Sequence, residues 1–154
     1  MQTPYPIRRD SDGSISFITD SGIIYTATFL DASYHFEDVS NIYEFNLYPN
    51  REASSTDSRV GLTVVYIIEI FFQNSQNVLL YICESLDRRH KARKRKFDGW
   101  FKRFANDAFQ KHDFELCVED IEILISIILT KDNPNRNDLF TAFLATYDLY
   151  LSVK

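Results

Sequence analysis

The stretch Val78–Phe104, VLLYICESLDRRHKARKRKFDGWFKRF, contains the sharpest change of character in the chain. It opens with the uninterrupted apolar run VLLYIC, which is typical of an interior strand. The basic remainder, Glu84–Phe104, predicts a helix, with a break at Asp98-Gly99 left open. A buried strand that leads directly into a charged helix indicates a fold that mixes both element types.

The predicted basic helix is amphipathic. Residues that share one face at helical spacing are Leu86, His90, Arg93, Phe97, Trp100, Phe101 and Phe104. The aromatic members are expected to anchor the helix to a sheet, and most Lys and Arg residues to face solvent. His90 and Arg93 break this pattern, and a buried Arg needs a carboxylate partner. The candidate partners are Glu84, Asp87, Glu69 and Glu44.

Upstream of this stretch, the sequence predicts an antiparallel meander. The strands SISFIT and IIYTATFL flank a turn at Asp20-Ser21-Gly22, and Tyr5–Arg9 is expected to add an edge strand. The alternating run NIYEFNLY ends at Pro49. A helix over Arg59–Asn74, apolar nearly all round, then predicts a buried central element. Its N-cap is Asp57 or Ser58.

Downstream, FELCVED and IEILISIILT read as two strands or one bent strand, and Asn133-Pro134 begins a last helix. The apolar stripe of that helix is Leu139, Phe140, Phe143, Leu144, Tyr147 and Leu151. This order predicts a single α+β domain over residues 1–154. It has a mainly antiparallel sheet with an N-terminal meander, a buried central helix, a basic amphipathic helix and a C-terminal helix.

The net charge of −5 conceals an asymmetry. Ser85–Arg103 holds nine basic and two acidic residues, a net +7, so the remainder carries −12. A uniform nucleic-acid coat is thereby excluded, whereas a local basic stripe is not. The N-terminus lacks the apolar run of a secretory signal, and the most apolar window is too short for a membrane span. We therefore expect a cytoplasmic protein in which Cys83 and Cys117 are buried reduced thiols rather than a disulfide.

Known catalytic patterns are missing from the sequence. The four glycines lie far apart, which excludes a P-loop or a dinucleotide fingerprint, and no G-x-S-x-G elbow occurs. His35, His90 and His112 are isolated, without metal-ligand spacing. We therefore predict no catalytic residues, no metal site and no cofactor.

Three stretches resemble a family of small uncharacterised bacterial domains of unknown function. The first is an F-x-T-D-x-G-x-x-Y strand pair, the second a Cys-acidic-x-x-Asp segment followed by Arg, Phe and Trp, and the third an Asn-Pro before the last helix. The matching positions are Phe17, Thr19, Asp20, Gly22, Tyr25, Cys83, Glu84, Asp87, Arg93, Phe97, Trp100, Asn133, Pro134 and Phe143. The resemblance implies a bacterial, stand-alone cytoplasmic domain and carries no assigned activity.

These observations favour a non-enzymatic binding or regulatory module that contacts a protein partner or a small anionic ligand. The candidate contacts are Glu84, Asp87, His90 and Arg93. The alternative is a nucleic-acid-associated protein that uses the basic helix 88–103. Its contacts would be Arg88, Arg89, Lys91, Lys94, Arg95, Lys96, Lys102 and Arg103. A third hypothesis is a hydrolase or toxin-like enzyme with the first four residues in one cleft. A homodimer remains open.

Overall fold

The protein, seen in a computed structural model that describes residues 2–33, 36, 39–139, 141–143 and 145, is built on one seven-stranded sheet. The strands are β1 (Arg8–Arg9), β2 (Ile15–Ile18), β3 (Ile24–Asp31), β4 (Ile42–Pro49), β5 (Val78–Glu84), β6 (Phe109–Val118) and β7 (Ile121–Thr130). Their order is β1-β2-β3-β4-β5-β7-β6. The helices are α1 (Ser58–Phe71) and α2 (His90–Phe104), with residues 136–139 and 141–143 helical near the C-terminus. The predicted α+β class is confirmed.

The N-terminal meander forms as predicted. Gly13 and Gly22 adopt φ values of 89° and 85°, which explains why glycine occupies both turns. The edge strand is shorter than expected, because only β1 pairs with β2. Tyr5 instead turns inward, where its ring stacks on Phe17 and its amide donates to Thr63 Oγ1 at 2.8 Å.

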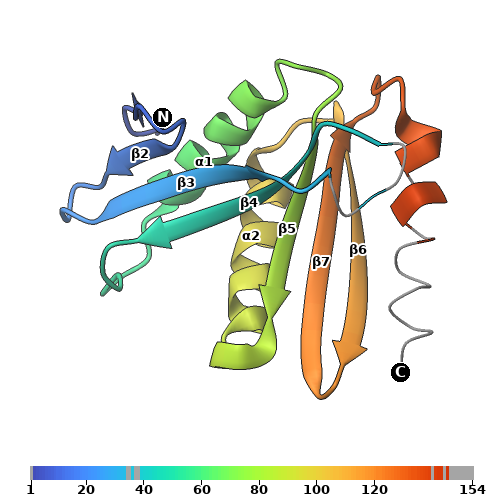
Figure 1. The fold of residues 1–154 in the computed structure, drawn as a ribbon. Coiled ribbons are helices and arrows are strands. Elements are labelled where there is room, and N and C mark those ends of the chain that lie inside the picture. Colours follow the sequence, from blue (N-terminus) through green and yellow to red (C-terminus); the bar gives the residue numbers. More distant parts are fainter. Residues whose placement is uncertain (1, 34–35, 37–38, 140, 144, 146–154) are drawn as a thin grey trace.

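The junction of β4 and β5 is the parallel pairing in an otherwise antiparallel sheet. These strands pair through three residues each, ending at Glu44 and Leu80. Beyond that point they diverge (Figure 1). β4 still pairs with β3 as far as Pro49, and β5 with β7 as far as Glu84. The sheet therefore opens into a V between the carboxyl ends of its two central strands.

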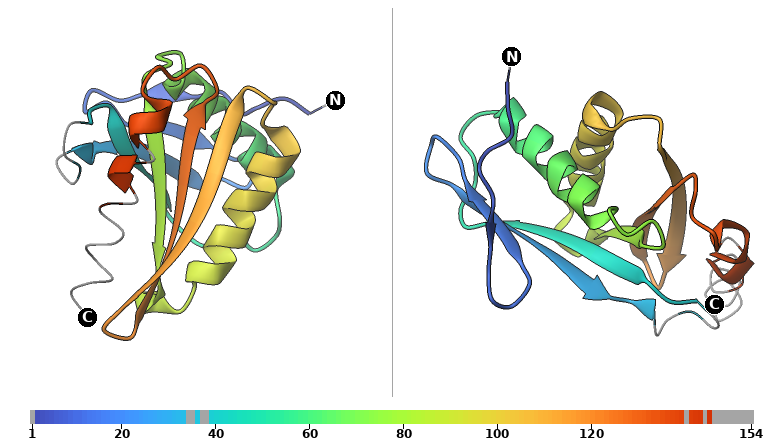
Figure 2. Two further views of the ribbon diagram at one scale, coloured as in Figure 1. Left: turned by 90° about the vertical axis from the view of Figure 1, so that its right-hand side faces the viewer. Right: turned by 90° about the horizontal axis from the view of Figure 1, so that it is seen from above.

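The helices cover the sheet on both faces (Figure 2). α1 and α2 lie on one face, over a core that includes Phe45, Val64, Ile67, Phe97 and Ile128. The C-terminal helix covers the other face, where its Leu139 and Phe143 join a second cluster. Of the stripe predicted for that helix, Phe140, Leu144, Tyr147 and Leu151 lie outside the described residues. No described helix is long and apolar enough to span a bilayer.

Helix α1 begins where the sequence indicated. Asp57 is its N-cap, and the Asp57 carboxylate accepts a hydrogen bond from the Arg59 amide at 2.9 Å. The helix is buried along most of its length, as its apolar sequence predicted.

Helix α2 is shorter than predicted at its N-terminal end. The strand β5 continues to Glu84, and Ser85–Asp87 form a single 3₁₀ turn, η2. Arg88 then adopts a left-handed conformation, with φ at 60°, so the helix cannot start before His90. Leu86 therefore lies off the helical face, and it is 71% exposed. The break considered at Asp98-Gly99 is absent, since α2 runs unbroken through both residues.

The last two strands are a tight hairpin, which decides between the two readings of that region. Glu119 and Asp120 both have positive φ, as a two-residue turn requires. β6 is an edge strand, and Cys117 on it is exposed, so the prediction that this thiol is buried is wrong. Cys83 is buried on the central β5, and both cysteines are free, as expected.

Candidate functional site

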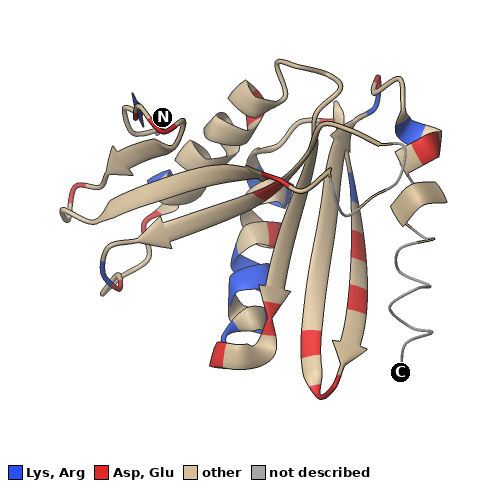
Figure 3. Cartoon of the chain, in the orientation of Figure 1, with Lys and Arg blue, Asp and Glu red and all other residues tan. Residues whose placement is uncertain are grey.

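A groove lies where β4 and β5 diverge. Its first lobe, about 450 Å³ in volume, lies between the end of β4 and helix α2. Its apolar lining comes from Tyr25, Leu47, Pro49, Tyr81 and Trp100. The charged residues of the first lobe are Glu52, Asp87, Arg89, Arg93 and Lys96. Figure 3 shows Lys and Arg residues of α2 behind the opening between the two strands.

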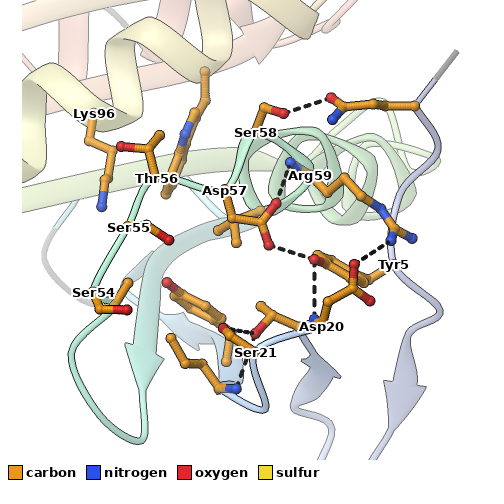
Figure 4. A pocket seen from close by; sticks show the side chains of 17 residues that line it. Tyr5, Asp20, Ser21, Ser54, Ser55, Thr56, Asp57, Ser58, Arg59 and Lys96 are labelled. Carbon is orange, nitrogen blue, oxygen red and sulfur yellow. Dashed lines mark hydrogen bonds and ion pairs between the residues drawn. The ribbon is translucent and has the colours of Figure 1, made fainter.

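A second lobe of about 410 Å³ lies beside the N-terminus of α1 (Figure 4). Six serine and threonine side chains line it: Thr19, Ser21, Ser54, Ser55, Thr56 and Ser58. Both lobes are lined by Tyr25, Ala53, Lys96 and Trp100. The two lobes therefore adjoin at these four residues, and we call them together the groove; the first lobe has more apolar lining and the second is rich in hydroxyl groups.

The N-terminus of α1 is held by a compact polar cluster (Figure 4). The second carboxylate oxygen of Asp57 accepts a hydrogen bond from the Tyr5 hydroxyl at 2.5 Å. The Arg59 guanidinium stacks on the Tyr5 ring at 3.8 Å and pairs with Asp20 at 3.4 Å. Burial and the bond to Asp57 raise the pKa of Tyr5, so the phenol stays protonated. This cluster fixes the floor of the hydroxyl-rich lobe.

Charge in the groove is nearly balanced by ion pairs. Arg89 contacts Glu52 at 2.6 Å, and Arg93 contacts Asp87 directly. Among the described residues, Lys96 has no carboxylate partner; its ammonium lies 5.8 Å from the centre of the Trp100 ring. Lys96 also lines both lobes. It is therefore the cation best placed to meet an anionic ligand.

Two of the four predicted contact residues come together at the groove. Arg93 bonds to the Asp87 side chain and donates to the Glu84 main-chain oxygen at 3.2 Å. The hydrogen bond that Arg93 donates to Asp87 raises the pKa of Arg93, and the same bond lowers the pKa of Asp87. The Arg93 side chain is 39% exposed, which fits a position at the rim of the core.

The other two predicted residues do not join them. His90 is buried and its Nε2 lies 3.5 Å from Glu122 on β7, and it is not among the residues that line either lobe. Glu84 is exposed, and only its main-chain oxygen meets Arg93. Neither of the two lobes is lined by all four residues that the enzyme hypothesis places in one cleft.

Several basic residues of α2 are engaged in ion pairs with carboxylates of the same chain. Lys94 was expected to face solvent, but its side chain is 12% exposed and binds both Asp98 and Asp113. Lys111 bridges the same two carboxylates from β6. Burial would raise the pKa of Asp113, but bonds from Lys111, Ser126 and Lys94 outweigh it and lower that pKa strongly. This network joins α2 to the sheet edge.

The remaining residues of the predicted basic stripe divide into two groups. Arg89 pairs with Glu52, and Lys91 lies 3.9 Å from Glu122. The exposed residues for which the structure gives no carboxylate partner within the described chain are Arg88, Arg95, Lys96, Lys102 and Arg103.

Gly61 packs against Trp100 of the groove, and the sequence analysis did not identify it. A Cβ atom at this position would lie 2.2 Å from Trp100 Cδ1, so α1 and α2 meet there through glycine. This close approach places Trp100 at the junction of the two lobes. An isolated glycine inside an apolar helix is the signal that could have indicated it.

Comparison with known proteins places the chain in a family without assigning it an activity. No curated protein matches it, and neither does any solved structure. A family model does match residues 56–145, from the loop before α1 to the C-terminal helix. That range includes the second and third motifs noted in the sequence, whereas the Phe17–Tyr25 motif lies outside it. The chain belongs to the Family of unknown function (DUF6169).

Proposed function

We propose that this chain is a binding module for a small anionic ligand that has an extended, amide-bearing arm. The observation that carries the proposal is the short pairing of β4 and β5, which ends at Glu44 and Leu80 beside the groove. Ligands of sheets with parallel strands commonly bind at the carboxyl ends of strands that diverge.

The arm is expected to lie between the strands. Residues 45–49 of β4 and 81–83 of β5 have main-chain groups on their inner edges beyond the last shared pair, whereas the Glu84 main-chain oxygen already accepts from Arg93. Main-chain donors and acceptors of this kind require partners. A ligand with amide groups supplies both, as an added strand does. Leu47, Tyr81 and Trp100 would contact its apolar segments.

The anionic head is expected beside Lys96, in the hydroxyl-rich lobe. The serine and threonine hydroxyls there can donate to phosphate or carboxylate oxygens. Asp57 weighs against direct contact with the first turn of α1, because its carboxylate already caps that helix. The head therefore lies toward Lys96 rather than on the helix axis.

The test uses two probes that share phosphate groups and differ in the arm. Coenzyme A has an extended arm with amide groups, and 3′-phospho-ADP, which is its nucleotide part, has none. Binding is followed by the fluorescence of Trp100, the single tryptophan, which lines both lobes. Two main-chain hydrogen bonds at about 1 kcal/mol each would make coenzyme A bind on the order of tenfold or more tighter than 3′-phospho-ADP.

Variants locate the head. Lys96→Gln is expected to weaken both probes severalfold, whereas Lys102→Gln, which removes an exposed cation outside the groove, should leave them unchanged. Equal binding of coenzyme A and 3′-phospho-ADP would contradict a role for the arm. Equal effects of the two lysine variants on the affinity of the probes, or no binding of either probe, would contradict the proposed ligand site beside Lys96.

Nucleic-acid binding is the second candidate, supported by the exposed cations on and before α2. If these cations act together, the protein should bind an RNA oligonucleotide, and its affinity should fall steeply as the salt concentration rises. Replacing Arg95, Lys102 and Arg103 with Gln would then abolish retention and leave the groove intact. RNA binding that is unchanged by these three substitutions would exclude this function.

A further inference from the structure

One ion pair spans the mouth of the groove. Glu52 belongs to the segment that follows β4, and Arg89 to the segment between β5 and α2. Arg89 Nη1 lies 2.6 Å from Glu52 Oε1. Both residues line the first lobe, at 67% and 78% side-chain exposure for Arg89 and Glu52. The pair thus joins the two sides that diverge below it.

The segment 50–57, which we call the strap, is held mainly at its ends. Asn50 donates to the Ile24 main-chain oxygen at 2.9 Å, and Asp57 caps α1. Residues 51–56 are all exposed, and they border both lobes. The Arg51 guanidinium donates a hydrogen bond to the Ser21 main-chain oxygen. For Ala53–Thr56 the structure gives no hydrogen bond or ion pair within the described chain, so the pair made by Glu52 is the tether nearest the strap's middle.

We propose that Glu52 is an internal substitute for the ligand's anionic group, and that it masks Arg89 as an anion-binding residue while it holds the strap closed. A carboxylate and a phosphate offer an arginine fork the same pair of oxygen acceptors. An exposed pair contributes little to stability, so an entering phosphate or carboxylate can displace it. Arg93 and Arg59 hold comparable pairs, but neither spans the mouth.

The masking role rests on the proposed function, whereas the strap tether does not. A ligand-free measurement therefore comes first. Acrylamide, a neutral quencher, should reach Trp100 more readily in Glu52→Gln and in Arg89→Gln than in the unmodified chain, because both lose the tether. The closed-to-open ratio should fall by up to about fivefold, the range of an exposed pair. Glu69→Gln, on an exposed position of α1 outside the groove, is the charge-matched control.

Salt gives the second ligand-free readout. Quenching of the unmodified chain should rise with ionic strength, since exposed charges are screened, and the two variants should be insensitive to it. Quenching that is the same in all four proteins would overturn the proposal.

The masking of Arg89 is tested with inorganic pyrophosphate as the probe. Glu52→Gln should bind it up to about fivefold tighter and Arg89→Gln more weakly. Opposite changes in pyrophosphate affinity for the two variants indicate masking, because loss of a purely structural pair would change the affinity of both variants in the same direction. Weaker binding to Glu52→Gln would overturn the proposal. If no variant binds pyrophosphate while quenching behaves as expected, the tether stands and the ligand site fails, together with the masking of Arg89.

Discussion

The contact between Gly61 and Trp100 makes a sharp prediction, because the chain has a matched control for it. Gly61→Ala adds a Cβ atom 2.2 Å from Trp100 Cδ1 and 2.6 Å from Trp100 Cγ and Nε1. Gly99→Ala, in the middle of α2, adds one with nothing within 4 Å. Both changes gain the same helix propensity, about 1 kcal/mol for alanine over glycine. The difference between them therefore isolates the contact.

The expected magnitudes follow from the geometry. To restore ordinary contact the Trp100 ring or a helix must move by more than 1 Å (a Cβ contact is ordinarily at least 3.4 Å). Overpacking of this kind costs about 1–3 kcal/mol. Gly99→Ala should thus stabilise the protein by about 1 kcal/mol, and Gly61→Ala should be less stable than Gly99→Ala by about 1–3 kcal/mol.

Urea unfolding followed by circular dichroism measures this difference without using Trp100 as the reporter. Gly61→Ala should also shift the emission of Trp100, because the ring is displaced within the groove. Equal unfolding free energies for the two variants would refute the close packing of α1 on α2.

Three further predictions concern single side chains. The pKa of Asp113 is lowered in the folded state, so the stability that its ionised carboxylate contributes is present above about pH 5 and is lost as the pH falls below about 4. Asp113→Asn should lower the free energy of unfolding by about 1 kcal/mol at pH 7, after solvent screening, and should make the urea midpoint fall less steeply with decreasing pH. An unchanged fall of the midpoint in acid would contradict the network. Arg93→Met should change the free energy of unfolding by less than about 1 kcal/mol in urea melts, because its pair is partly exposed, and a loss of several kcal/mol would show that it is buried. Ellman's reagent should modify Cys117 alone in the native protein and Cys83 only after unfolding, because Cys83 is buried and its burial raises the pKa of its thiol. Reaction of both thiols in the native protein would contradict this prediction.

Sequence periodicity predicted the elements well where one face of an element is buried. The apolar run of β5, the cap at Asp57 and the glycine turns at Gly13 and Gly22 follow from local chemistry. The start of α2 did not, because the left-handed Arg88 has no sequence signature of its own. A wheel drawn from Glu84 therefore included Leu86, which the 3₁₀ turn keeps outside the helix.

The candidate site was predictable only in part, because its decisive feature is a pairing between strands. Asp87 was one of four carboxylates named as candidate partners of Arg93, since an arginine on the buried face of a helix needs a counter-charge. Lys94 was misplaced because Asp113, its partner on β6, approaches through the sheet order rather than through sequence proximity. The groove itself depends on where β4 and β5 separate, which no local pattern of residues encodes.

The central claim is that the diverging ends of β4 and β5 hold a ligand's arm through their main-chain groups. Amide hydrogen exchange, resolved by residue with and without coenzyme A, tests it most directly. We predict slower exchange concentrated in residues 45–48 and 81–84 when coenzyme A is present, with 3′-phospho-ADP protecting these amides far less. Protection confined to other parts of the chain, or none at saturating coenzyme A, would contradict it.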